Sequence, residues 1–292
     1  MKYSTFILGQ PSLDVNTDFG GAVVKEVGGA VIQSAYAAAA LGHQVAVLPK
    51  CAGDIDAVAA FAARENIAVF PLASGASTSI SNVYHTADRE RRTCRAISKI
   101  DPYKATEIPK TDAPIWHIAG LMWGDFDETV IEYAAKNAKA AVDVQCLLRR
   151  EEDGEMVFRD WPCKRETLPM ITFLKTDAAE AEILTGLSDR VAAAKQLHAW
   201  GAKEIMITHH NEVLVYDGHK VHTCPLKARN LTGRTGRGDN CFSSYITERL
   251  AQDIPQALLT AAALTSLKME TPGPFRRNRA DVEGYIKTFY NC

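Results

Sequence analysis

The chain has 292 residues, of which 47% are hydrophobic and 23% charged, and this composition excludes a disordered or collagen-like protein. Its 33 basic and 35 acidic residues give a formal net charge of −2, which argues against nucleic acid or an anionic membrane as a partner held by overall charge. Seven widely spaced cysteines without a C-x-x-C pair predict neither a disulfide framework nor a cysteine-rich zinc site. The first apolar run, at residues 6–8, is too short for a signal peptide, so a cytoplasmic protein is expected.

Short apolar runs of strand length alternate with helical patterns along most of the chain. Strands are predicted at 4–8, 44–48, 67–70, 114–118, 140–144, 171–174 and 204–208, and helices at 30–41, 54–64, 127–138, 178–184 and 189–200. Asp54 is the expected N-cap of the second helix. After residue 212 we expect three strand-like pieces and then two helices, the second capped by Asp253. This alternation predicts a doubly wound α/β fold, in which a mostly parallel sheet carries helices on both faces.

A polar region interrupts the alternation and predicts a small β lid. Residues 74–102 show period-two alternation around a turn at 87–90, which is typical of a hairpin, and residues 23–27 are predicted to be a strand of the same small sheet. We expect lid strands within 10–28 and 74–102, laid over a single α/β domain that spans 1–292. A homodimer that forms through this lid is a further hypothesis.

A glycine-rich loop at residues 233–238 precedes a helical pattern. Glycines can direct successive backbone N–H groups at one point, and the start of a helix adds partial positive charge, so this loop predicts an anion site. Asp239 would repel a bound phosphate, but it fits as the base for a nucleophile that attacks the phosphate. The alternative is a plain turn in which Asp239 is only a helix N-cap. The loop lacks the third glycine of a dinucleotide fingerprint, and the sequence contains no Walker A motif.

These motifs, in this order, resemble those of the PfkB/ribokinase family of carbohydrate kinases across nearly the whole chain. Residues 236–239 resemble the family's G-A-G-D signature, and Gly28 with Gly29 resembles its N-terminal di-glycine motif. Asp14 resembles its substrate-contacting aspartate, and residues 177–186 resemble its N-x-x-E motif together with the E-x-x-L-T-G sequence that continues it. Within the family, the parts of the chain that are similar to the myo-inositol kinase branch are residues 143–145 with Arg149, residues 233–239 and residues 272–277.

The resemblance implies a ribokinase-like fold and transfer of the γ-phosphoryl group of ATP to a hydroxyl of a sugar or cyclitol, with myo-inositol as a candidate. Asp239 would accept the hydroxyl proton, while the loop residues Gly236, Arg237 and Gly238 would hold the developing charge, through the backbone N–H groups of Arg237, Gly238 and Asp239. The resemblance also places substrate binding at Asp14, Gly28, Gly29, Gln33 and Arg149, nucleotide binding at Thr208, Thr235, Gly236 and Gly238, and Mg²⁺ at Glu180 and Asp177.

Some residues depart from the family pattern. Gly233 stands where many relatives have an aspartate that can ligate a monovalent cation, so we expect little or no activation by K⁺. Arg237 replaces the usual alanine and adds positive charge near the transferred phosphoryl group. The basic clusters at 89–92 and 276–279 are interpreted as solvated surface, because they have no interleaved aromatic stripe for nucleic acid.

Two alternative functions stay open on the sequence. The first is a nucleoside kinase of the same fold, and the second is a polyol-binding protein without catalysis. A metal site at the four histidines between 209 and 222 is not expected, because His219 and His222 would point to opposite faces of a strand.

Overall fold

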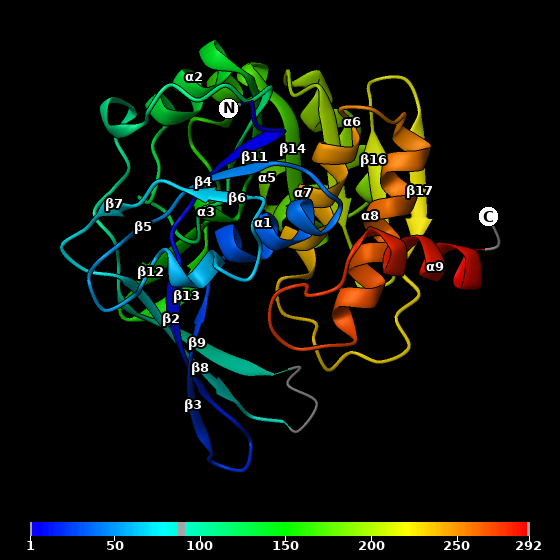
Figure 1. Ribbon diagram of the computed structural model, residues 1–292. Coiled ribbons are helices and arrows are strands. Elements are labelled where there is room, and N and C mark those ends of the chain that lie inside the picture. The colour runs from blue at the N-terminus through cyan, green and yellow to red at the C-terminus, as the bar shows by residue number, and fades with distance from the viewer. Residues whose placement is uncertain (1, 87–90, 291–292) are drawn as a thin grey trace.

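A nine-stranded sheet forms the centre of the computed structural model, which describes residues 2–86 and 91–290 (Figure 1). Seven neighbouring strands are parallel, and the last two, β16 and β17, are antiparallel. In spatial order the strands are β17 (Val221–Pro225), β16 (Glu212–Tyr216), β15 (Glu204–Thr208), β14 (Ile171–Asp177), β11 (Lys139–Asp143), β10 (Ile115–Ile118), β1 (Thr5–Leu8), β4 (Val45–Leu48) and β6 (Ile67–Val69). Central strands such as β1 are buried along their whole length, because helices cover both faces, and the predicted α/β class is confirmed.

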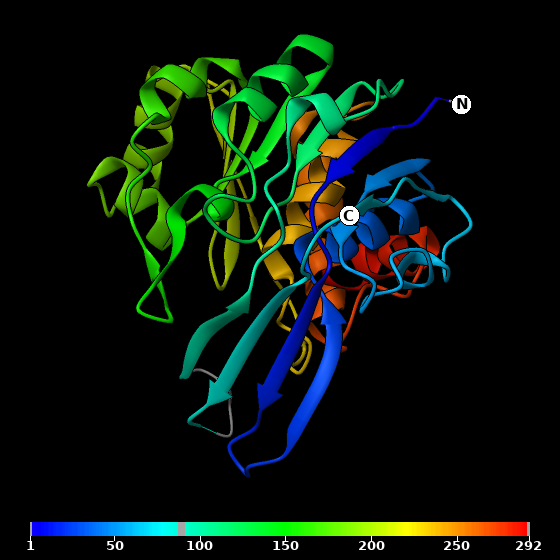
Figure 2. The ribbon, with the colours of Figure 1, turned by 90° about the vertical axis from the view of Figure 1, so that its left-hand side faces the viewer.

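Two layers of helices lie on opposite faces of this sheet (Figure 2). One layer contains α1 (Ala30–Ala40), α7 (Arg237–Glu248), α8 (Ile254–Met269) and α9 (Arg279–Phe289). The other contains α2 (Glu128–Asn137), α5 (Ala178–Thr185) and α6 (Arg190–Ala199). Two short helices, α3 (Gln145–Leu148) and α4 (Lys164–Thr167), are formed in addition to these layers. None of the helices within the described residues combines the length and apolar character that a membrane span requires.

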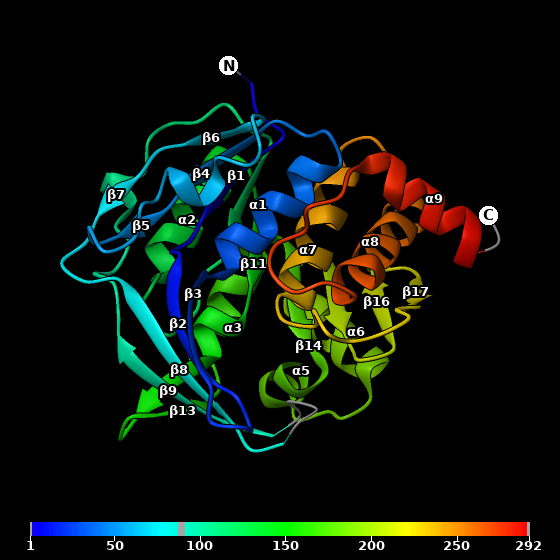
Figure 3. The same cartoon turned by 60° about the horizontal axis from the view of Figure 1, so that its bottom comes forward.

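A second, six-stranded sheet projects from the body as a lid (Figures 1 and 2). Its strands are β12 (Arg149–Glu152), β13 (Glu155–Phe158), β9 (Arg92–Ser98), β8 (Thr78–Tyr84), β2 (Ser12–Thr17) and β3 (Val23–Gly28). Four of them come from the predicted ranges, whereas β12 and β13 were not anticipated, and the expected turn at 87–90 lies outside the described residues. In Figure 3 the lid lies on one flank and α7 with α8 on the other, with α3 and α5 between them.

The helix predicted at 54–64 is wrong. This segment contains one 3₁₀ turn, Ala59–Phe61, next to a small sheet of β5 (Lys50–Cys51) and β7 (Leu72–Ala73). The carboxylate of Asp54 accepts a hydrogen bond from the Ser77 hydroxyl, so it cannot cap a helix, and Asp56 instead accepts the Ala59 N–H at 2.9 Å.

The expectation for the C-terminal part also needs correction. Two strands, β16 and β17, follow residue 212 where three were expected. A third helix, α9, was not anticipated; Asn278 caps it by accepting the Asp281 N–H at 3.1 Å. The cap expected at Asp253 is confirmed, because its side chain accepts the Gln256 N–H at 3.0 Å.

Candidate active site

A cavity of 480 Å³ is formed by lid residues together with residues at the carboxyl ends of the parallel strands. The body contributes Thr208 from the end of β15, Asp177 from the end of β14 and the whole segment 234–239. The remaining residues on the wall are Ser12, Asp14, Asn16, Glu26, Gly29, Ala30, Ile80, Asn82, Tyr84, Arg92, Leu121, Gln145, Arg149 and Lys175. The cavity therefore brings together most of the residues that the sequence singled out.

The glycine loop ends at the start of α7. Gly236 is the N-cap residue with φ of 78°, in the left-handed region, and a Cβ there would lie 2.6 Å from the Gln33 side chain, so only glycine fits. The Arg237 N–H donates to the Arg234 carbonyl at 3.2 Å, which corrects the expectation that this N–H holds the developing charge. Gly238 and Asp239 are also in the first helical turn, whose N–H groups have no acceptor within the helix and can face an anion.

Asp239 has the electrostatic surroundings of a proton acceptor. Burial raises its pKa to about 6, the negative charge of Asp143 acts in the same direction, and Lys175 and Lys268 oppose both. A carboxylate with a pKa in this range is ionised near neutral pH and still binds a proton well enough to take one from a hydroxyl during the reaction.

Lys175, near the end of β14, lies at the centre of a buried charge cluster. Its Nζ is 3.0 Å from Asp143 Oδ2 and 3.8 Å from Glu180 Oε2, and the side chain is 6% exposed. Burial lowers the pKa of Lys175, but the neighbouring carboxylates outweigh this and raise it above its usual value. A Cβ on Gly238 would lie 3.1 Å from Nζ, so the ammonium group contacts the first turn of α7. Lys175 was not predicted from the sequence; the available signal was a lysine directly after the apolar run that ends at Leu174.

Asp177 and Glu180, the predicted Mg²⁺ residues, form a reciprocal cap on α5. Asp177 Oδ1 accepts the Glu180 N–H at 2.8 Å, and Glu180 Oε2 accepts the Asp177 N–H at 2.7 Å. Asp177 is on the cavity wall, whereas Glu180 is buried behind it, and burial raises the pKa of Glu180 to about 7. Carboxylate oxygens are the ligands that Mg²⁺ prefers, so the donor chemistry fits, although no group of three or more His, Cys, Asp or Glu within the described residues is placed to hold a metal ion.

Polar side chains line the cavity on the lid side. Ser12 Oγ donates to Asp14 Oδ1 at 2.9 Å, and burial raises the pKa of Asp14. Asn82 Nδ2 donates to Asn16 Oδ1 at 3.0 Å, and Asn16 Nδ2 donates to Glu26 Oε1 at 2.6 Å. Amides and carboxylates in such a row can bind several hydroxyl groups at once. Of these residues only Asp14 was predicted from the sequence; Asn16, two positions later on the same strand and therefore on the same face, was an available signal.

Two arginines complete the wall. Arg149, predicted from the sequence, lines the cavity, and its Nη2 is 3.0 Å from Cys94 Sγ. Arg92 also lines it, with Nη1 3.4 Å from the Tyr84 hydroxyl; Arg91 and Arg92 are exposed, as expected for this cluster, and residues 89 and 90 lie outside the described residues. In the other basic cluster Arg276 and Arg277 are exposed, as expected, whereas Arg279 pairs with Glu248 at 2.6 Å.

Two of the predicted substrate residues do not lie on the cavity wall. Gln33 lies against Gly236, and its Oε1 accepts a hydrogen bond from Asn240 Nδ2 at 2.9 Å, so it supports the loop from behind. Gly28 lies next to Asp14, where a Cβ would be 2.7 Å from the carboxylate, while its neighbour Gly29 reaches the wall.

Comparison with known proteins gives matches along most of the chain. Residues 6–278 match the profile of the pfkB family carbohydrate kinases. A solved pyrophosphate-dependent kinase in the ribokinase family, complexed with a pyrophosphate analog and myo-inositol, is 33% identical; the match covers 96% of this chain and 99% of that one, with a TM-score of 0.86. A cytidine kinase of Thermococcus kodakarensis is 26% identical over 82% of this chain and 86% of its own length. The ribokinase of Arabidopsis thaliana complexed with ribose and ATP shares the fold, with 15% identity, a TM-score of 0.74, and coverage of 98% of this chain and 99% of that one.

Proposed function

The chain belongs to the PfkB family of carbohydrate kinases, and we propose that it transfers a phosphoryl group from inorganic pyrophosphate to a hydroxyl of a cyclitol such as myo-inositol. The family makes the protein a phosphotransferase that acts on hydroxyl groups. The observation that carries the rest is the cavity itself, whose wall contains Asp239 together with polar lid residues and the cationic side chains of Lys175, Arg234 and Arg237.

The lid wall supports a polyol as the acceptor. Asp14, Glu26, Asn16 and Asn82 offer several acceptors and donors within one cavity, which suits a ring that carries a hydroxyl on every carbon. A nucleoside base would gain from aromatic stacking, and Tyr84 is the sole aromatic side chain among the described residues that line the cavity. The 33% identical relative complexed with myo-inositol supports the same choice.

The cationic end of the cavity supports a compact, highly charged donor. Lys175, Arg234 and Arg237 all line it next to the start of α7, so positive side chains and helix N–H groups meet in one place. Pyrophosphate concentrates its charge in a small volume and needs no pocket for a base. The same relative is pyrophosphate-dependent.

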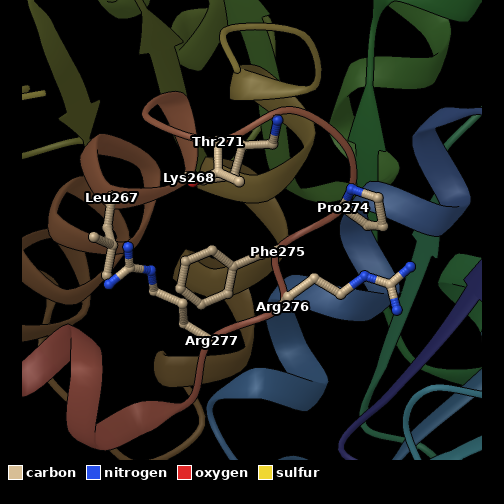
Figure 4. A pocket seen from close by; sticks show the side chains of 7 residues that line it. All are labelled: Leu267, Lys268, Thr271, Pro274, Phe275, Arg276 and Arg277. Atoms are coloured by element: carbon tan, nitrogen blue, oxygen red, sulfur yellow. The ribbon is translucent and has the colours of Figure 1, made fainter. Parts of the chain in front are cut away.

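ATP, the donor expected from the sequence, is the second candidate, and one observation favours it. A smaller cavity of 190 Å³ lies beside the end of α8, and its wall includes the apolar side chains of Leu267, Pro274 and Phe275 (Figure 4). Such a wall suits a planar ring. Lys268 lines this cavity as well, and its charge acts on Asp239.

The reaction that we propose needs a base and positive groups that stabilise the charge on the transferred phosphoryl group. Asp239 takes the proton from the acceptor hydroxyl, whose oxygen forms a bond to the transferred phosphorus while the bridging P–O bond breaks and orthophosphate leaves. Lys175, Arg237 and the N–H groups of Gly238 and Asp239 stabilise the charge that develops on the phosphoryl oxygens. Mg²⁺, when bound, would neutralise charge on the donor, and Asp177 and Glu180 are the residues that would hold it.

A donor and acceptor screen tests this function. We expect orthophosphate release from pyrophosphate that depends on myo-inositol, and slower turnover when ATP replaces pyrophosphate at the same concentration. The acceptors to compare are inositols, hexoses, pentoses and nucleosides, with release of orthophosphate or ADP as the readout. Turnover with ATP alone would contradict the donor, and turnover with nucleosides alone would contradict the acceptor. Binding of a polyol without any turnover would indicate a binding protein.

The activity is expected to fall at acid pH. Because burial raises the pKa of Asp239 to about 6, the carboxylate becomes protonated below that pH and can no longer accept the hydroxyl proton. We therefore expect kcat/KM to decline about tenfold for each pH unit below the midpoint, which should lie near pH 6. The affinity for myo-inositol without donor, measured by calorimetry, should not decline in this pH range. A kcat/KM that stays constant across the same range would rule Asp239 out as the base.

A further inference from the structure

A buried lysine holds the loop that precedes the catalytic aspartate. Lys268, near the end of α8, is 2% exposed, and its Nζ donates to the carbonyl oxygen of Gly233 at 2.6 Å and to that of Thr235 at 2.7 Å. Both carbonyls belong to the turn that leads directly into α7. In Figure 4 Lys268 lies beside Thr271 on the wall of the small cavity, apart from Phe275.

These partners are unusual for a buried lysine. Burying an ammonium group is costly unless close partners compensate, and carboxylates are the usual ones, as for Lys50 with Glu107 at 2.9 Å. Lys268 instead meets two backbone carbonyl oxygens, and Asp239 and Glu26 act on it from further away. Carbonyl oxygens that converge on one positive centre are the arrangement by which proteins hold a dehydrated monovalent cation.

The packing around Gly233 makes this arrangement a fixed part of the fold. A Cβ on Gly233 would lie 1.9 Å from the Thr271 carbonyl oxygen, so no side chain, including an aspartate that could ligate a cation, fits at this position. The Gly233 N–H donates to the Met269 carbonyl at 2.7 Å, and the Thr271 N–H donates to the Lys268 carbonyl at 3.1 Å. The loop therefore docks directly on the end of α8, and the Lys268 ammonium group brings a positive charge to the carbonyls of Gly233 and Thr235.

We propose that the ammonium group of Lys268 is a tethered replacement for a free monovalent cation, and that it fixes the loop so that the first turn of α7 faces the phosphoryl donor. Lys268 is thus a positioning residue, which acts on the reaction through the carbonyls of Gly233 and Thr235. The proposal rests on the kinase activity proposed above. It gives a structural reason for the expected independence from K⁺, and it implies that removal of the side chain leaves a space, bordered by two carbonyls, that a small free cation can enter.

The test is chemical rescue of Lys268→Ala. In a buffer whose cation is tetramethylammonium, we expect kcat to fall about 100-fold, because the N–H groups at the start of α7 lose their fixed direction. Addition of K⁺ or NH₄⁺ should then raise kcat of the variant about tenfold or more and leave the wild type unchanged. Lys268→Arg keeps the charge and N–H donors, so it should lose less activity and should not respond to K⁺.

Lys50→Ala is the matched control. Lys50 is buried to the same 2% and also donates to a backbone carbonyl, that of Pro102 at 2.9 Å, but it lies outside the cavity wall. Its removal should lower the unfolding temperature without making the activity respond to K⁺. If Lys268→Ala does not fold, Lys268→Ser replaces it and leaves the same space open, and K⁺ should then raise the unfolding temperature of the variant above the value in tetramethylammonium.

The outcomes separate this proposal from the proposed function. No turnover by the wild type with any donor and acceptor contradicts the function itself. If the wild type turns over, full activity of Lys268→Ala without K⁺ overturns the role of Lys268. A loss of activity that neither K⁺ nor NH₄⁺ restores in a folded variant overturns it too, as does activation of the wild type several-fold by K⁺.

Discussion

Asp239→Asn is expected to lower kcat by about 10²- to 10⁴-fold while leaving the affinity for myo-inositol almost unchanged. The amide has nearly the shape of the carboxylate, but it cannot accept the proton of the acceptor hydroxyl. Asp239 lies at the start of α7, where the positive charge of Lys175 acts on its carboxylate. Orthophosphate release gives kcat, and calorimetry gives the affinity.

Asp14→Asn is the matched control on the lid. Asp14 lines the same cavity and is partly buried like Asp239, but it belongs to β2 and not to the loop before α7. We expect this variant to raise KM for the acceptor far more than it changes kcat, because in the proposed function Asp14 binds substrate hydroxyls without taking their proton. If Asp239→Asn changes KM and kcat in the manner expected of Asp14→Asn, Asp239 is a binding residue and the proposed base is wrong.

Lys175→Met is expected to lower kcat by about 10²- to 10³-fold and to destabilise the protein by about 3–5 kcal/mol. The loss of activity follows from the missing positive charge beside the first turn of α7. The loss of stability follows because Asp143, whose Oδ2 is 3.0 Å from Nζ, becomes a buried carboxylate without its partner. Denaturant unfolding measures the second effect, and orthophosphate release at saturating substrate measures the first.

A double variant separates the two effects. Lys175→Met combined with Asp143→Asn removes both members of the ion pair, so much of the lost stability should return, since no unpaired charge is left between them. The activity should stay low, because the cation that faces the phosphoryl donor is still missing. Recovery of activity together with stability would show that Lys175 has a structural role only.

The local pattern of the sequence was enough for most of the sheet and for the helix that begins after the glycine loop. Apolar runs such as 4–8 and 114–118 correctly predicted β1 and β10, because a strand buried on both faces has to be apolar throughout. Asp239 and the glycines before it lie at the start of α7 and on the cavity wall, and the sequence indicated them because the motif consists of neighbouring residues in one order. Failures such as the helix at 54–64 arose where a side chain that could cap a helix bonds elsewhere, as Asp54 does with Ser77.

The sequence by itself therefore determined the α/β class, the family resemblance and the position of the expected base, all of which depend on neighbouring residues or ordered motifs. Only the tertiary structure decided which side chains surround that base. Lys268 meets the carbonyl of a residue 35 positions earlier, and Gln33 meets Asn240 across 207 positions. Hydrophobic periodicity reports the face that one element buries, whereas a cavity is formed by the ends of many elements at once. The contacts that set its charge thus appear only when the sheet, the lid and α8 are brought together.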